Sequence, residues 1–70
     1  MNNRDRRIYR AGQVGRPLTQ SQLQRVNRYA WKSAQDGYPP EMEVAENFGM
    51  NVLIQWQRHH EISIQRRSEQ

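Results

Sequence analysis

The chain has 70 residues, of which 34% are hydrophobic, and a formal net charge of +4 at pH 7. A chain this short forms one domain with a small core, and without cysteine it has neither disulfides nor a thiolate metal site to stabilise it. No run approaches the ~20 apolar residues of a membrane span and the charged N-terminus is not a secretory signal, so we expect a cytoplasmic protein with no membrane partner.

The charge is distributed unevenly along the chain. Residues 1–35 contain eight basic residues and one acid, whereas residues 36–50 contain four acids and no base. Ten of the eleven basic residues are arginine, whose planar guanidinium binds phosphate oxygens and stacks on flat rings better than lysine does. A basic, arginine-rich half indicates contact with a polyanion.

Residues 1–17 are predicted to form a flexible basic arm. The segment contains two glycines and a proline. Its only sizeable apolar side chains are Ile8, Tyr9 and Val14. A solvated tail and a nascent helix that becomes ordered on a partner are both left open.

A first helix is predicted to start at Thr19 and to end at Asp36-Gly37. Thr19 and Gln22 have the spacing of a capping box, and Leu18 and Leu23 have that of a hydrophobic staple. Glycine can adopt the left-handed conformation that closes a helix. The apolar face of this helix comprises Leu23, Val26, Ala30 and Ala34, with Trp31 at its edge.

A short second helix is predicted from Pro40 to Phe48, ending at Gly49. Proline suits the first helical position because it lacks the N–H that would go unpaired there. Glu41 and Glu43 then lie in the first turn, where the helix dipole favours acids.

A third helix, capped by Asn51 and followed by a strand-like end, is predicted over residues 50–65. The alternation of polar and apolar residues at 61–65 is typical of a short strand. A continuous helix to about Arg67 is the alternative. The apolar face of the third helix would comprise Val52, Leu53 and Trp56, and both tryptophans, Trp31 and Trp56, are expected in the core.

The second and third predicted helices have the pattern of a helix-turn-helix. Gly49 permits a positive φ, and the small Ala45 four positions earlier lets two helices approach closely. The pattern resembles the DNA-binding domain of the LexA repressor family over residues 18–50. The residues that carry this resemblance are Leu18-Thr19, Gln22, Tyr29, Asp36-Gly37-Tyr38-Pro39-Pro40 and Glu43-Val44-Ala45-Glu46-Asn47-Phe48-Gly49-Met50.

The resemblance implies a mainly α, three-helix helix-turn-helix domain over residues 18–65, preceded by the arm (1–17) and followed by a tail (66–70). A vestigial wing is left open. The third helix would read bases in the major groove, because Asn and Gln pair with adenine and Arg with guanine. The candidate residues for base reading are Asn51, Gln55, Gln57 and Arg58. Phosphate contacts are expected from Arg4, Arg6, Arg7, Arg10, Arg16, Arg25, Arg28 and Lys32.

The predicted function is that of a small, non-enzymatic regulator of transcription that binds double-stranded DNA, with a homodimer left open. The alternative is a small phage-type protein that binds and inhibits or redirects a host protein such as RNA polymerase. The acidic residues 36–46 and the apolar run at 52–54 favour this alternative. No cofactor or metal is expected, because the adjacent residues 59–61 point in different directions on a helix.

Overall fold

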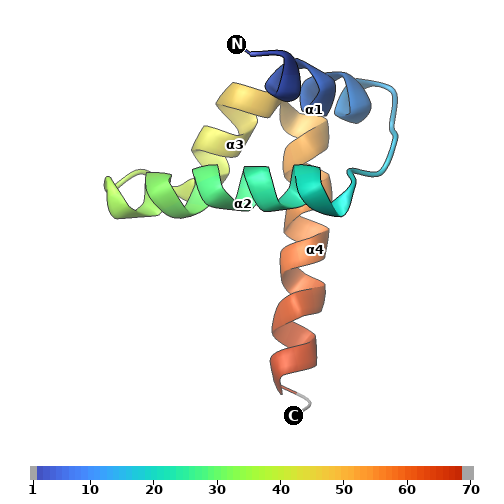
Figure 1. Ribbon diagram of the computed structural model, residues 1–70. Helices are drawn as coiled ribbons and strands as arrows, with labels where there is room; N and C mark the ends of the chain where they lie inside the picture. Colours follow the sequence, from blue (N-terminus) through green and yellow to red (C-terminus); the bar gives the residue numbers. More distant parts are fainter. Residues whose placement is uncertain (1, 69–70) are drawn as a thin grey trace.

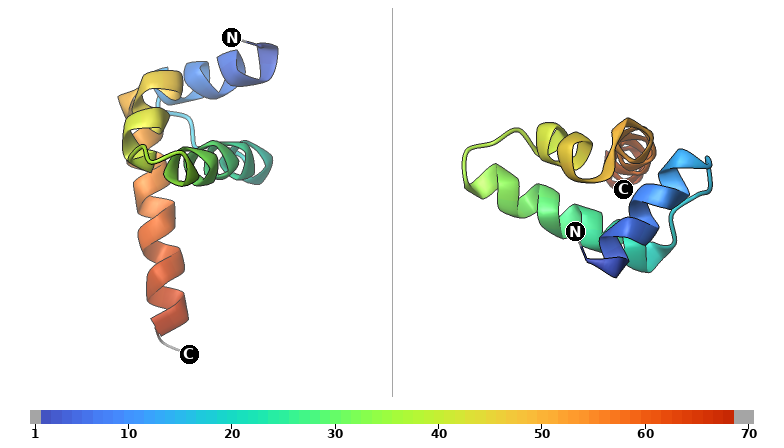
Figure 2. Two further views of the ribbon diagram at one scale, coloured as in Figure 1. Left: turned by 90° about the vertical axis from the view of Figure 1, so that its left-hand side faces the viewer. Right: turned by 90° about the horizontal axis from the view of Figure 1, so that it is seen from above.

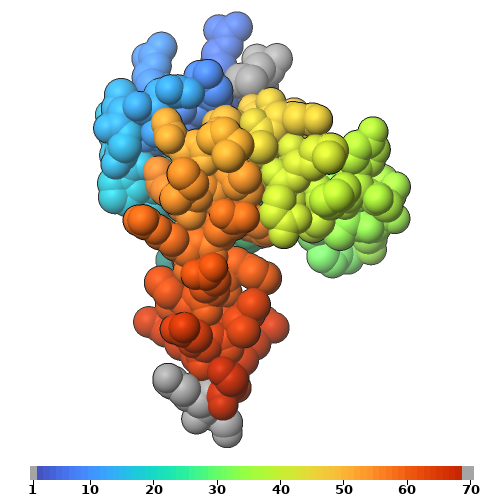
Figure 3. Space-filling view, turned by 180° about the vertical axis from the view of Figure 1, so that it is seen from behind, coloured from blue at the N-terminus to red at the C-terminus, as the bar shows by residue number. Residues whose placement is uncertain are grey.

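The computed structural model describes residues 2–68, and these residues form four helices and no strand. The helices are α1 (Asn3–Gln13), α2 (Gln20–Gln35), α3 (Pro40–Phe48) and α4 (Met50–Ser68). α2 crosses α4 at a steep angle, and α1 and α3 pack around the N-terminal half of α4 (Figure 1 and Figure 2). The C-terminal half of α4 extends beyond the other helices, as Figure 3 also shows. The protein is mainly helical, as predicted.

The ends of α2 and α3 follow local signals in the sequence. The backbone N–H of Gln22 donates to Thr19 Oγ1, and the backbone N–H of Thr19 donates to Gln22 Oε1, which forms the predicted capping box. Pro40 is the first residue of α3. Gly37 and Gly49 end the two helices with φ values of 88° and 94°. The predicted bounds of these two helices are confirmed.

Of the two alternatives for residues 1–17, the solvated, flexible arm is wrong, because residues 3–13 form α1, and this helix is ordered against the chain's own core. The helix begins where the side chain of Asn2 accepts a hydrogen bond from the backbone N–H of Asp5, at 2.9 Å. Ile8 and Ala11 are 1% and 4% exposed and belong to the same core as α2, α3 and α4. The arm and the predicted helix-turn-helix domain therefore share one core.

Small residues let α1 dock with only a narrow apolar stripe. Gly12 faces α4 so closely that an added Cβ would lie 2.5 Å from Val52 Cγ2. A larger residue would hold α1 away from α4, and Ile8 would then lose its buried environment. Close approach thus compensates for the few apolar side chains of this segment.

The strand-like end predicted after the third helix is also wrong, and the alternative of a continuous helix is confirmed. Residues 61–65 lie inside α4, where their backbone groups bond within the helix, and no strand exists in residues 2–68 for them to pair with. Asn51 lies in the first turn of α4 instead of capping it, because the helix begins at Met50. The predicted tail is helical to Ser68, and its last residues, 69–70, lie outside the described residues.

One tryptophan lies in the core and the other does not. Trp56 is 7% exposed, as predicted, and its indole N–H donates to Asn27 Oδ1. Trp31 is 65% exposed, so its predicted place in the core is wrong. On α2 it lies about 140° around the helix from the fully buried Val26, which directs it away from α3 and α4.

A single residue, Gly49, joins α3 to α4. Its φ of 94° lies in the region that favours glycine, and an added Cβ would lie 3.2 Å from Tyr9 Cε2. The connection is shorter than the turn of roughly three to four residues in DNA-binding helix-turn-helix motifs. The two helices thus change direction at the predicted glycine, but through a tighter junction.

Replacing Ile8 by Ala is expected to lower the free energy of unfolding by about 2–5 kcal/mol, because the side chain is fully buried. Ile8→Val should cost about 0.5–1.5 kcal/mol. Urea unfolding followed by far-UV circular dichroism measures both. Arg6→Ala, on the exposed side of the same helix, is the control and should change stability by less than about 0.5 kcal/mol. An unchanged midpoint for Ile8→Ala would contradict the docking of α1.

Candidate nucleic-acid interface

Six arginines from α1, α2 and the loop between them line a groove. They are Arg4, Arg7, Arg10, Arg16, Arg25 and Arg28, and we call this surface the arginine groove. It consists of two adjoining hollows that share Arg7 and Gln22. The groove exists because α1 packs chiefly against α3 and α4, which leaves space between α1 and the N-terminal half of α2. All six residues were predicted phosphate contacts.

One acid, Asp5, links the two walls of the arginine groove. Arg25 Nε donates to Asp5 Oδ1 at 2.6 Å, and the hydroxyl of Tyr29 donates to Oδ2 at 3.3 Å. The hydrogen bond to Asp5 raises the pKa of Arg25 above its ordinary value. The described residues that line the groove include no acid, so the other five arginines face it without a carboxylate in the lining.

The first turn of α2 adds polar groups to the arginine groove. Thr19, Ser21 and Gln22 line it together with the arginines. The N-terminal end of a helix carries partial positive charge, which favours anions, although the backbone N–H groups of Thr19 and Gln22 are already used by the capping box. The groove therefore combines fixed positive charge with hydrogen-bond donors, which is the chemistry that binds phosphate.

Two predicted phosphate contacts lie outside the arginine groove. Arg6 is exposed on the side of α1 that faces away from the core, about 160° around the helix from Ile8. Lys32 is exposed on α2 about two turns beyond Arg25. Both remain available to an extended polyanion, but neither lines the groove.

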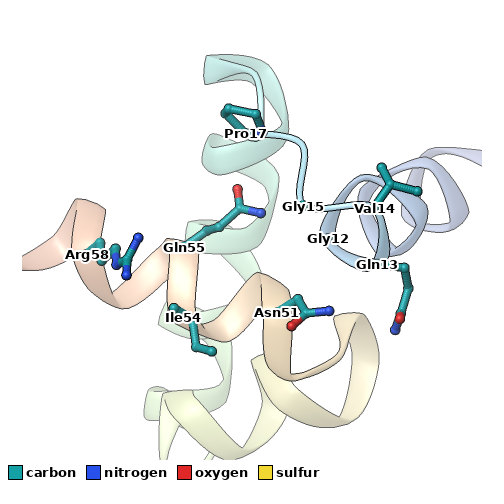
Figure 4. A pocket seen from close by; sticks show the side chains of 9 residues that line it. All are labelled: Gly12, Gln13, Val14, Gly15, Pro17, Asn51, Ile54, Gln55 and Arg58. Atoms are coloured by element: carbon teal, nitrogen blue, oxygen red, sulfur yellow. The ribbon is translucent and has the colours of Figure 1, made fainter.

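Three of the four predicted base-reading residues lie together. Asn51, Gln55 and Arg58 follow one face of α4 and, with Ile54, border a hollow that residues 12–17 close on the other side (Figure 4). We call it the loop hollow. Gln57 is exposed on another side of α4, about 160° around the helix from Gln55. Pro17 lines both the loop hollow and the arginine groove, so the two surfaces lie on either side of the α1–α2 loop.

The amide of Gln55 is already bonded to the chain itself. The backbone N–H of Leu18 donates to Gln55 Oε1 at 2.9 Å, and Gln55 Nε2 donates to the carbonyl oxygen of Arg16 at 3.0 Å. Gln55 thus holds the α1–α2 loop against α4, and it would have to release the loop to read a base. The sequence carries no signal for this role, because the partners are 39 and 37 residues away.

Comparison with protein-family models, curated proteins and solved structures finds no match. The likeness to the LexA repressor family therefore rests on the sequence pattern alone. Within residues 2–68, no group of three or more His, Asp or Glu side chains could hold a metal ion. No helix of this part is long and apolar enough to cross a bilayer. The described surface has a concentration of arginines with polar side chains beside it.

Replacing Gln55 by Leu is expected to lower the free energy of unfolding by about 1–3 kcal/mol, because it leaves the N–H of Leu18 without its partner. Gln57→Leu is the matched control, since it removes the same amide from an exposed position of the same helix. Thermal unfolding of both variants measures the difference. Equal stability of the two variants would show that Gln55 does not hold the loop.

Proposed function

We propose that this protein is a small DNA-binding regulator of transcription whose arginine groove binds the phosphate backbone of duplex DNA. The observation that supports this proposal is the concentration of six arginines in one groove whose lining contains no acid. Neutralising phosphates releases the counterions condensed on DNA, which supplies salt-dependent affinity without regard to sequence. The arginine groove would therefore position the protein along the backbone.

Sequence preference would come from the residues beside the loop hollow. Asn51 and Arg58 are exposed on one face of α4, about two helical turns apart, whereas Gln55 is used by the loop. Arginine pairs with guanine and asparagine with adenine. A module of this size has little surface for DNA, so we expect it to bind as a homodimer or in several copies.

A second candidate function is binding to a host protein such as RNA polymerase. It is favoured by Tyr38 and Met42, which are 57% and 46% exposed around the start of α3, next to the exposed Glu41. An acid at this position would repel a DNA backbone, while an exposed aromatic and methionine suit a protein interface. Retention of one stoichiometric protein from nuclease-treated lysate, with no affinity for DNA, would favour this candidate over the first.

Replacing Arg7 and Arg28 together by Gln is expected to weaken binding to duplex DNA and to make it less sensitive to salt. The slope of log K against log salt concentration should fall by about 1 to 2, since each phosphate contact contributes about 0.9. Fluorescence anisotropy of a labelled duplex over a salt series gives the slope. Arg25 is left intact because it bonds to Asp5.

Arg66→Gln with Arg67→Gln is the matched control for this experiment. It removes the same charge from the exposed C-terminal end of α4, away from the arginine groove. The control should keep most of the wild-type affinity. If both double variants lose the same affinity, binding follows net charge alone and the groove has no special role.

Replacing Asn51 and Arg58 together by Ala is expected to reduce the preference for a sequence selected from random duplexes by about 1–3 kcal/mol per lost base contact. Binding to a scrambled duplex should change much less, because the arginine groove is intact. Competition between the selected and scrambled duplexes measures the preference. A preserved preference would remove α4 from base reading.

A further inference from the structure

The two tryptophans of the chain differ sharply in their surroundings. Trp56 is buried and bonded to Asn27, whereas Trp31 is 65% exposed on α2. A chain with so few apolar residues would gain stability by burying this large ring. Its exposure on α2 is therefore an observation that the core does not explain.

Trp31 is flanked by positive charge on the outer side of α2. Arg28 lies three residues before it and Lys32 one residue after it, and all three side chains are exposed. At 100° per residue they fall within about 100° of one another around the helix. α2 contains three basic residues and no acid, so this face favours a polyanion over an acidic or purely apolar partner.

The same face continues the arginine groove. Arg28 lines the groove and lies about one helical turn, ~5 Å along the axis, from Trp31. A strand whose phosphates contact Arg28 therefore passes within a nucleotide's reach of the indole. The bases of an intact duplex are covered by their neighbours in the stack, so only an unpaired base can present its face to Trp31.

We infer that the outer face of α2 binds nucleic acid with unpaired bases, one of which stacks on Trp31 while Arg28 and Lys32 hold the flanking phosphates. This inference rests on the proposed binding of phosphates in the arginine groove, and it adds a site for an unpaired base beside that groove. Stacking of bases on an aromatic ring tolerates any base sequence, because every base has a flat face.

The test compares short oligo(dT) with a blunt duplex of equal length, using the full chain and fluorescence anisotropy. Trp31→Ala should weaken binding of oligo(dT) about 10- to 100-fold, which is the range of base–aromatic stacking, and should change duplex binding less than about twofold. Trp31→Phe should restore most of the affinity, since a ring is still present. Tyr38→Ala is the control, because it removes an exposed aromatic that does not lie on α2.

Tryptophan fluorescence gives a second readout. Oligo(dT) should quench the emission of the wild-type protein and shield it from acrylamide. The Trp31→Phe variant retains only the buried Trp56 and should show neither effect.

The outcomes separate this inference from the proposed function. If the variant with Arg7→Gln and Arg28→Gln loses all binding while Trp31→Ala keeps its affinity for oligo(dT), the stacking role alone is overturned. If the wild-type protein binds neither oligo(dT) nor the duplex, both the stacking role and the proposed function are overturned. A wild-type dimer that Trp31→Ala converts to a monomer in sedimentation, without nucleic acid, would assign the face to a second copy and overturn the inference.

Discussion

The carboxylate of Asp5 is the interaction on which the basic half of the molecule depends. Both walls of the arginine groove are positively charged, and residues 1–35 contain no second acid to offset their repulsion. Asp5 bonds to Arg25 and Tyr29 of α2, and Tyr29 packs edge-on against Phe48 of α3 with ring centroids 5.4 Å apart. One acid thus ties α1 to the core through the wall of the groove, and leaves the remaining arginines for an external anion.

Much of the first half of α4 packs against the rest of the chain, whereas a recognition helix would present more of its surface to DNA. Val52 and Leu53 are buried, and Val52 contacts Gly12 of α1. Gln55 fixes the loop between α1 and α2. These contacts occupy most of the helix faces that a free recognition helix would present, so the proposed base reading is assigned to Asn51 and Arg58, which remain exposed beside the loop hollow.

The parts of the fold that the sequence predicts are those specified by neighbouring residues. The capping box at Thr19 and the glycine at 49 act within a few positions, and the bounds of α2 and α3 follow from such signals. The docking of α1 depends on Val52, 40 positions from Gly12, and the role of Gln55 on residues equally remote, so neither could be predicted locally. A weaker signal for α1 was present in the spacing of Asn2 and Asp5, which matches a helix cap, and in Ile8, Ala11 and Gly12 at i, i+3 and i+4.

Two helices that pack against each other, α2 and α3, carry opposite charge. α2 has three basic residues and no acid, whereas α3 has three acids and no base, so a polyanion is attracted to the α1–α2 side and repelled from α3. A strand held in the arginine groove can reach Asn51 and Arg58 only by continuing past the α1–α2 loop, because Pro17 borders both surfaces. Gln55 of α4 holds this loop in place through its two hydrogen bonds. If the two surfaces act as proposed, Gln55 would set the distance between them without reading a base, because any shift of the loop changes that distance.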